Sequence, residues 1–144
     1  MTEMFEQVKA LYGRYTEQAT ALEQNRKIGE GLLGFGKKPA DDPCHMRFAE
    51  ELAALLRAFA AEGPDSYDAV QVLEYVFRAQ SEFRQILSIY WMLSAVHGAA
   101  EPLIGCLSEE DAQRLLALYD REVPRRERLP VQKQVYKLLK KQCR

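Results

Sequence analysis

The chain has 144 residues, of which 47% are hydrophobic and 28% are charged, so it is long enough for one domain with an apolar core and too hydrophobic to be disordered. Its 20 basic and 21 acidic side chains give a net charge of −1, which excludes a strong attraction of the whole molecule to nucleic acid or to an anionic membrane. The longest stretch without a charge, residues 85–100, has 16 residues, fewer than the roughly 20 that a membrane-spanning helix needs.

The first predicted element is a long amphipathic helix over residues 1–28. Apolar side chains recur in it at spacings of three and four, which places them on one stripe of a helix. This stripe consists of Phe5, Val8, Tyr12, Tyr15, Ala19 and Leu22. It can pack within the fold or against a second copy of the chain. We favour packing within the fold, because two tyrosines and an alanine make a poor coiled-coil seam.

A loop is predicted over residues 29–43, where four glycines and two prolines interrupt the apolar pattern. Residues 29–34 match the spacing G-x-G-x-x-G, and residues 31–37 match G-x-x-x-x-G-K, two patterns typical of phosphate-binding loops. Such loops follow a β-strand, and a Ser or Thr after the lysine binds magnesium. Here a helical pattern precedes the glycines, and Lys38 follows Lys37. We therefore interpret the glycines as the end of the first helix and predict no nucleotide cofactor.

Residues 44–122 are predicted to form the helical core, which begins with two helices. Asp42 and Pro43 supply an N-cap and a first-turn proline, and Gly63 followed by a proline ends the helix that they start. Asp65 or Ser66 is expected to cap the next helix. The apolar residues that we expect to face inward are Phe48, Leu52, Leu55, Leu56, Phe59, Val70, Leu73, Val76 and Phe77.

The third helix of this core is predicted to open at Ser81 and to stop at Gly98, since glycine often follows the last residue of a helix. It is apolar on nearly every side, so we expect it at the centre of the fold. A short apolar turn over residues 102–107 follows. Ser108, with Asp111 three residues later, forms a near capping box that begins the next helix.

The C-terminal part of the chain is strongly basic. Residues 121–144 hold nine basic and two acidic side chains, a charge of +7, whereas residues 1–120 carry −8. Two prolines bias the residues before them away from helical angles, which predicts an extended, exposed loop over 123–130 and a last helix over 131–144. The candidate residues for binding a partner are Arg125, Arg126, Arg128, Lys133, Lys137, Lys140 and Lys141.

The basic segment has three interpretations that the sequence leaves open. Its side chains can form a solvated face that neutralises acidic surface elsewhere in the fold, they can bind an acidic protein, or they can follow the phosphates of a nucleic acid. Nucleic acid is the least favoured of the three, because Tyr136 is the only aromatic side chain among these bases on which a nucleobase could stack.

The residue types of a zinc or thiol site occur at Cys44, His45, His97 and Cys106. Two adjacent residues and two that are nine positions apart do not match the short ligand spacings of zinc sites. A cysteine in the first turn of a helix favours the thiolate, but His45 points away from its neighbour on a helix, which leaves His97 as the only base. We therefore predict no metal cofactor and no catalytic residues.

Taken together, these patterns predict an all-α fold in which about six helices form one compact domain without an internal repeat. The sequence shows no secretory signal and no disulfide framework, so we expect a cytoplasmic protein that does not bind membranes. The favoured function is a non-catalytic module that binds a protein partner or a second copy of itself. The alternatives are a nucleic-acid-associated protein that uses the basic C-terminal segment and, less favoured, a Cys/His metal or thiol protein.

Overall fold

The computed structural model describes the backbone of residues 3–32, 43–82 and 90–143 and the side chains of residues 3–21, 43–79 and 94–143. In this part of the chain there are six α-helices, one short 3-10 helix and no β-strand, so the predicted all-α fold is confirmed. The elements are α1 (Glu3–Leu32), α2 (Pro43–Ala61), α3 (Ser66–Glu82), α5 (Tyr90–Ile104), α6 (Glu109–Glu122), η2 (Arg125–Glu127) and α7 (Pro130–Gln142). None of the described helices is both long enough and apolar enough to span a bilayer.

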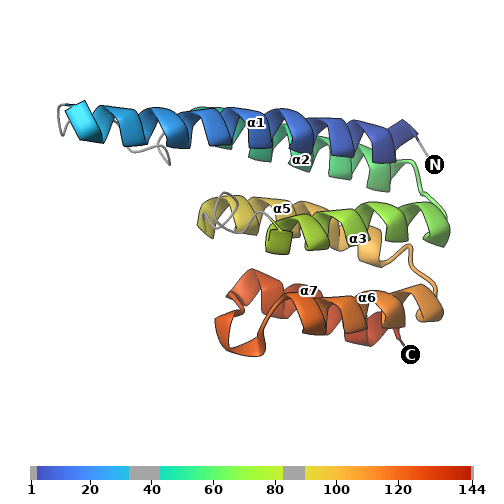
Figure 1. Cartoon of the computed structure of the whole chain (residues 1–144). Helices are drawn as coiled ribbons and strands as arrows, with labels where there is room; N and C mark the ends of the chain where they lie inside the picture. The colour runs from blue at the N-terminus through green and yellow to red at the C-terminus, as the bar shows by residue number, and fades with distance from the viewer. Residues whose placement is uncertain (1–2, 33–42, 83–89, 144) are drawn as a thin grey trace.

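The α-helices form three stacked layers of two helices each (Figure 1). The layers pair α1 with α2, α3 with α5 and α6 with α7, and consecutive helices run in opposite directions. Between layers, α1 packs on α3 and α3 on α6, while α2 packs on α5 and α5 on α7. The result is a compact all-α bundle in which helices of neighbouring layers pack extensively on one another. The chain reaches this arrangement without a sequence repeat that would predict it.

The first layer is held together by aromatic side chains on the predicted stripe of α1. Val8, Tyr12, Tyr15 and Ala19 are all buried and Phe5 is half-buried, whereas the side chain of Leu22 lies outside the described residues. The ring of Tyr12 meets Phe48 of α2 edge-on at 5.0 Å between centroids, and the ring of Tyr15 stacks on the same phenylalanine at 4.1 Å. The stripe therefore packs within the fold, as the sequence indicates.

The middle layer is buried on both sides, because the first and third layers cover it (Figure 1). Its described interior side chains are almost all apolar, and several have no exposed surface. They are Ala69, Val70, Val72, Leu73, Val76, Phe77, Ala79, Val96, Ala99, Ala100, Leu103 and Ile104. Burial of this apolar area is the main source of the stability of the stack.

Two predicted helix ends in this region are wrong. Ser81 lies inside α3, which runs to Glu82, and it does not open a new helix. Helix α5 continues through Gly98 and ends only at Ile104, although Pro102 lies inside it. A proline in the last turn removes one hydrogen bond, to the carbonyl four residues earlier. Burial of the residues on both sides of Pro102 outweighs this loss.

The prediction of a loop over residues 29–43 is wrong for residues 29–32. Helix α1 extends to Leu32, so Gly29 and Gly31 lie within it. The first half of the G-x-G-x-x-G pattern is thus helical and does not form a strand-to-helix turn. The rest of the loop, including Asp42 as an N-cap, lies outside the described residues.

Serine and aspartate side chains cap α3 and α6 and join the second layer to the third. The carboxylate of Asp65 accepts a hydrogen bond from the backbone N–H of Asp68 at 2.9 Å. The hydroxyl of Ser108 accepts one from the backbone N–H of Asp111 at 3.1 Å, as its capping pattern predicts. The hydroxyl of Ser66 donates to the Asp111 carboxylate and accepts from the backbone N–H of Ser108. The N-termini of α3 and α6 are therefore fixed to each other.

We expect Leu73→Ala to lower the free energy of unfolding by about 2–5 kcal/mol, because it leaves a cavity in a layer covered on both faces. Urea denaturation followed by circular dichroism measures this loss. Met46→Ala is the matched control, since Met46 is 57% exposed, and it should change the free energy by no more than about 0.5 kcal/mol. Equal effects of the two substitutions would contradict the layered packing.

Candidate functional site

The basic C-terminal segment is divided between the interior and the surface of the third layer. The loop predicted as extended contains one turn of 3-10 helix, Arg125–Glu127, because the N–H of Glu127 donates to the carbonyl of Pro124. Arg125 and Arg126 are exposed, as expected, but Arg128 is buried. The prediction that residues 123–130 form an extended, exposed loop is therefore wrong for this turn and for Arg128.

The guanidinium of Arg128 is enclosed by groups from α6, α7 and the turn between them, and its side chain is only 5% exposed. Its Nε donates to the carbonyl of Val123 at 3.1 Å, and an Nη donates to the carboxylate of Asp120 at 3.0 Å. It lies 4.4 Å from the ring centroid of Tyr136 and 5.4 Å from that of Tyr119. The charge of Arg128 is thus engaged by groups of the protein itself, and Arg128 does not contribute to the surface that a partner could contact.

The carboxylate of Asp120 is the counter-ion of this cluster. Burial by itself would raise its pKa. Hydrogen bonds from Arg128 and Tyr136, together with the positive charges of Arg125 and Arg128, outweigh burial and lower the pKa of Asp120 below its usual value. Asp120 is therefore ionised at neutral pH and neutralises Arg128.

Four lysines occupy the side of α7 that faces away from the core, whereas Val135 and Leu139 are buried on the opposite side. The lysine face of α7 consists of Lys133, Lys137, Lys140 and Lys141. It extends over about 12 Å at the helical rise of 1.5 Å per residue. None of the four lies within ion-pair distance of an acidic side chain in the described part of the chain. The positive charge of the lysine face is therefore not neutralised by ion pairs with described residues.

The aromatic ring of Tyr136 lies beside the lysine face but is already covered by cations. Arg125, Arg128 and Lys140 lie 5.9, 4.4 and 5.4 Å from its centroid. Its hydroxyl donates to Asp120 at 3.2 Å. The ring is half-buried and engaged, so it does not offer a platform on which a nucleobase can stack.

The cysteine and histidine candidates occupy different layers. In the first layer, Nδ1 of His45 and the hydroxyl of Tyr15 share a hydrogen bond of 2.8 Å. Between the second and third layers, Nε2 of His97 and the hydroxyl of Tyr119 share one of 3.1 Å. Burial raises the pKa of both tyrosines, which keeps their hydroxyls protonated at neutral pH. Both histidines thus have hydrogen bonds typical of buried polar groups.

The two cysteines are also apart in the fold. Cys44 is buried beside His45 in the first layer, and Cys106 lies in the turn after α5, where its thiol points to the carbonyl of Pro102 at 3.9 Å. Among the described residues, no three His, Cys, Asp or Glu side chains come together as a metal site would require. The structure does not assemble Cys44, His45, His97 and Cys106 into one site.

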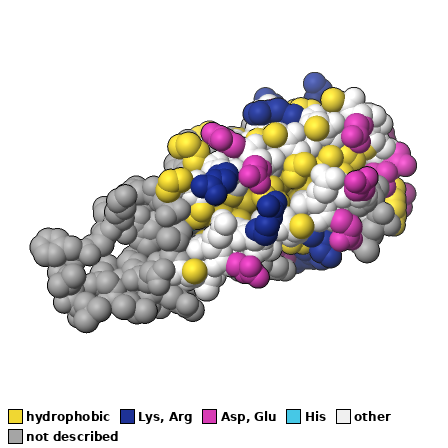
Figure 2. All heavy atoms as spheres, turned by 90° about the horizontal axis from the view of Figure 1, so that it is seen from above, with side chains coloured by type: hydrophobic (Ala, Val, Ile, Leu, Met, Phe, Trp, Pro, Cys, Tyr) yellow, Lys and Arg dark blue, Asp and Glu magenta, His cyan; other side chains and the backbone are white. Residues whose placement is uncertain are grey.

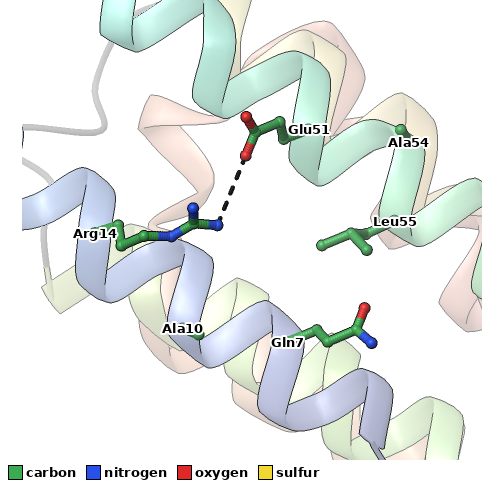
Figure 3. Close-up of a pocket in the computed structure, with 6 residues that line it drawn as sticks. All are labelled: Gln7, Ala10, Arg14, Glu51, Ala54 and Leu55. Carbon is green, nitrogen blue, oxygen red and sulfur yellow. Dashed lines mark ion pairs between the residues drawn. The ribbon is translucent and has the colours of Figure 1, made fainter.

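A hollow between α1 and α2 was not predicted from the sequence. It has a volume of about 450 Å³ and opens on the outer face of the first layer (Figure 3). Its lining consists of Gln7, Ala10, Arg14, Glu51, Ala54 and Leu55. Figure 2 shows hydrophobic side chains in a band along this face, bordered by charges of both signs. The only trace of the hollow in the sequence is the small size of Ala10 and Ala54. Residue size alone does not reveal how far apart α1 and α2 lie.

Comparisons of the chain with protein-family models, with characterised proteins and with solved structures find no match. The chemistry of the chain's own surfaces is therefore the guide to its function. Two described surfaces are candidates, the lysine face of α7 in the third layer and the hollow between α1 and α2 in the first.

We expect Arg128→Met to lower the free energy of unfolding by about 2 kcal/mol, because it removes charge-assisted hydrogen bonds and leaves Asp120 without its main partner. Arg126→Met is the matched control on an exposed neighbour and should cost no more than about 0.5 kcal/mol. Urea denaturation measures both values. If the two variants are equally stable, Arg128 does not hold the third layer.

The lowered pKa of Asp120 has a consequence for stability in acid. A carboxylate whose pKa is lower in the folded state contributes stability above its unfolded pKa of about 3.9 and loses it as the pH falls through the folded value. The difference in unfolding free energy between the wild type and Asp120→Asn should therefore be constant above about pH 5 and shrink below about pH 4.

Urea denaturation at a series of pH values measures this difference, with Glu127→Gln of η2 as the comparison. A difference between the wild type and Asp120→Asn that stays constant down to about pH 2 would contradict the ion pair, because the Asp120 pKa would then be the same in both states.

Proposed function

We propose that this protein is a non-catalytic protein-interaction module that binds the acidic surface of a partner protein through the lysine face of α7. The observation that supports this most directly is the exposure of four lysines on one helix, none of them within ion-pair distance of a described carboxylate. A partner's carboxylates would supply the missing counter-charges. Arg125 and Arg126 are exposed in the turn before α7, and Arg125 is paired with Asp120 at 3.7 Å.

Helix α7 is fixed firmly enough to present its lysines in a constant pattern. At its start, the side chain of Gln132 accepts a hydrogen bond from the backbone N–H of Leu129 at 2.8 Å. At its end, the side chain of Gln142 donates to the carbonyl of Leu107 at 2.7 Å. Between these points Val135 and Leu139 are fully buried. A preorganised helix loses less conformational freedom on binding, so more of the electrostatic attraction contributes to affinity.

An acidic protein fits this surface better than a nucleic acid does. The ring of Tyr136, the aromatic group nearest to the lysines in the described structure, is covered by cations and cannot stack on bases. Lysines act as flexible point charges, which suits the scattered carboxylates of a protein surface.

Affinity purification from the native cell tests this proposal. The bait is either the wild-type chain or the variant K133Q/K137Q/K140Q/K141Q, with and without nuclease treatment. We expect the wild type to retain a nuclease-resistant protein and the variant to recover about tenfold less of it, since charged contacts set association and specificity. The matched control K9Q/R57Q/R78Q/R114Q removes the same number of exposed positive charges from α1, α2, α3 and α6 and should retain the partner.

Two results would contradict the proposal. Equal capture by the wild type and by the lysine variant would show that the lysine face is not the binding surface. Loss of capture on nuclease treatment would show that a nucleic acid bridges the bait and the retained protein. Circular dichroism of each variant establishes that the helices are intact before the captures are compared.

A further inference from the structure

We propose that the hollow between α1 and α2 is a second docking site, and that its occupant is an acidic amphipathic helix of a partner protein. This site lies in the first layer, at the opposite end of the stack from α7 (Figure 1). It shares no residue with the lysine face, so the inference stands independently of the function proposed for α7.

Away from the Arg14–Glu51 pair the larger hollow is mostly apolar, with the amide of Gln7 as its other polar side chain (Figure 3). Ala10 of α1 and Ala54 of α2 are exposed, and their short side chains leave the space between the helices open. Leu55 points from α2 into this space and is half-buried (Figure 3). The whole hollow, whose lining also includes Gln7, Arg14 and Glu51, has a volume of about 450 Å³, which is room for more than one leucine-sized side chain. Apolar anchors of a partner would be removed from water here, which is the source of affinity in helix-in-groove binding.

A smaller hollow continues the first one along the same two helices. It has a volume of about 150 Å³ and shares Arg14 and Glu51 with the larger hollow. Its lining reaches Gln18 on α1 and Arg47 on α2. From Gln7 to Gln18 the two hollows cover about 16 Å along α1, or three helical turns. This length exceeds the roughly 10 Å spanned by anchors at positions i, i+4 and i+7 of a bound helix, so it accommodates all three together with a flanking charged residue.

The charge at the smaller hollow favours an acidic occupant. Arg14 and Glu51 are 3.8 Å apart, and their side chains are 69% and 47% exposed. An exposed pair of this length contributes little stability, so its members can exchange partners at low cost. Arg47 is exposed and has no carboxylate within ion-pair distance among the described residues. With two arginines and one glutamate, the smaller hollow has an excess positive charge that a partner's carboxylate would balance.

The same charges disfavour a second copy of the chain as the occupant. If two copies met through this face, each would present two arginines but only one carboxylate at the smaller hollow, so positive charge would remain unpaired across the interface. Like charges brought together across an interface oppose association. An unlike partner, with apolar anchors for the larger hollow and a carboxylate for the smaller one, satisfies both.

A library of helix-constrained twelve-residue peptides displayed on phage and selected against the full-length protein tests the proposal. We expect the enriched peptides to combine apolar residues at helical spacing with Asp or Glu one to two turns away. The affinity of an enriched peptide is then measured by fluorescence anisotropy. Ala54→Trp fills the larger hollow and Arg47→Glu reverses the charge at the smaller one, and each should weaken binding by about tenfold or more.

Two control variants locate the binding surface. Ala117→Trp places the same large side chain at an exposed position of α6 and should leave the affinity unchanged. The variant K133Q/K137Q/K140Q/K141Q should also bind the peptide normally. A failure of the α7 proposal is therefore distinguishable from a failure of this one. Circular dichroism shows whether each variant keeps its helices.

Three results would overturn the inference. The first is a selection that enriches no peptide family. The second is enriched peptides that bind Ala54→Trp and Arg47→Glu as tightly as they bind the wild type. The third is sedimentation showing that the chain self-associates and that Ala54→Trp abolishes this association, which would identify a second copy as the occupant.

Discussion

The buried guanidinium of Arg128 determines how the last layer of the protein is built. Its hydrogen bonds to Asp120 and to the carbonyl of Val123, and its contact with the ring of Tyr136, fix the turn between α6 and α7. Helix α7 then packs through its apolar side, and its lysines are left facing the solvent. The buried arginine thus contributes, together with the apolar side of α7, to fixing the helix on which the other basic side chains are displayed.

The layered architecture keeps the two proposed surfaces apart. The middle layer, α3 with α5, has most of its surface covered by neighbours, so its outward contacts are limited. The first and third layers each have one face that no other layer covers (Figure 1). The third layer offers a row of charges, whereas the first offers a hollow with an apolar end and a positive end. A partner on one of the two proposed surfaces would therefore not obstruct the other.

The sequence predicts the helices well where burial is periodic and less well where packing overrides local signals. The buried stripe of α1 and the serine cap of α6 follow from spacing alone. The stop expected at Gly98 is wrong because the buried residues beyond it keep α5 helical to Ile104. A count of charges cannot distinguish Arg128 from the other basic residues of 121–144. Its burial depends on side chains that α6 and α7 bring together in the folded protein. The hollow depends on the distance between α1 and α2, which no local pattern encodes.

The central claim is that the basic segment is divided into one buried arginine and a set of exposed side chains, and residue-resolved chemical modification tests it most directly. The protein is treated with an arginine-specific dicarbonyl and, separately, with an amine-reactive ester, and the rate at each residue is measured by mass spectrometry. We expect Arg128 to react much more slowly than Arg126, and all four lysines of α7 to react at rates near those of an unfolded peptide. Equal rates at Arg128 and Arg126, or protection of the lysines in the isolated protein, would contradict the account.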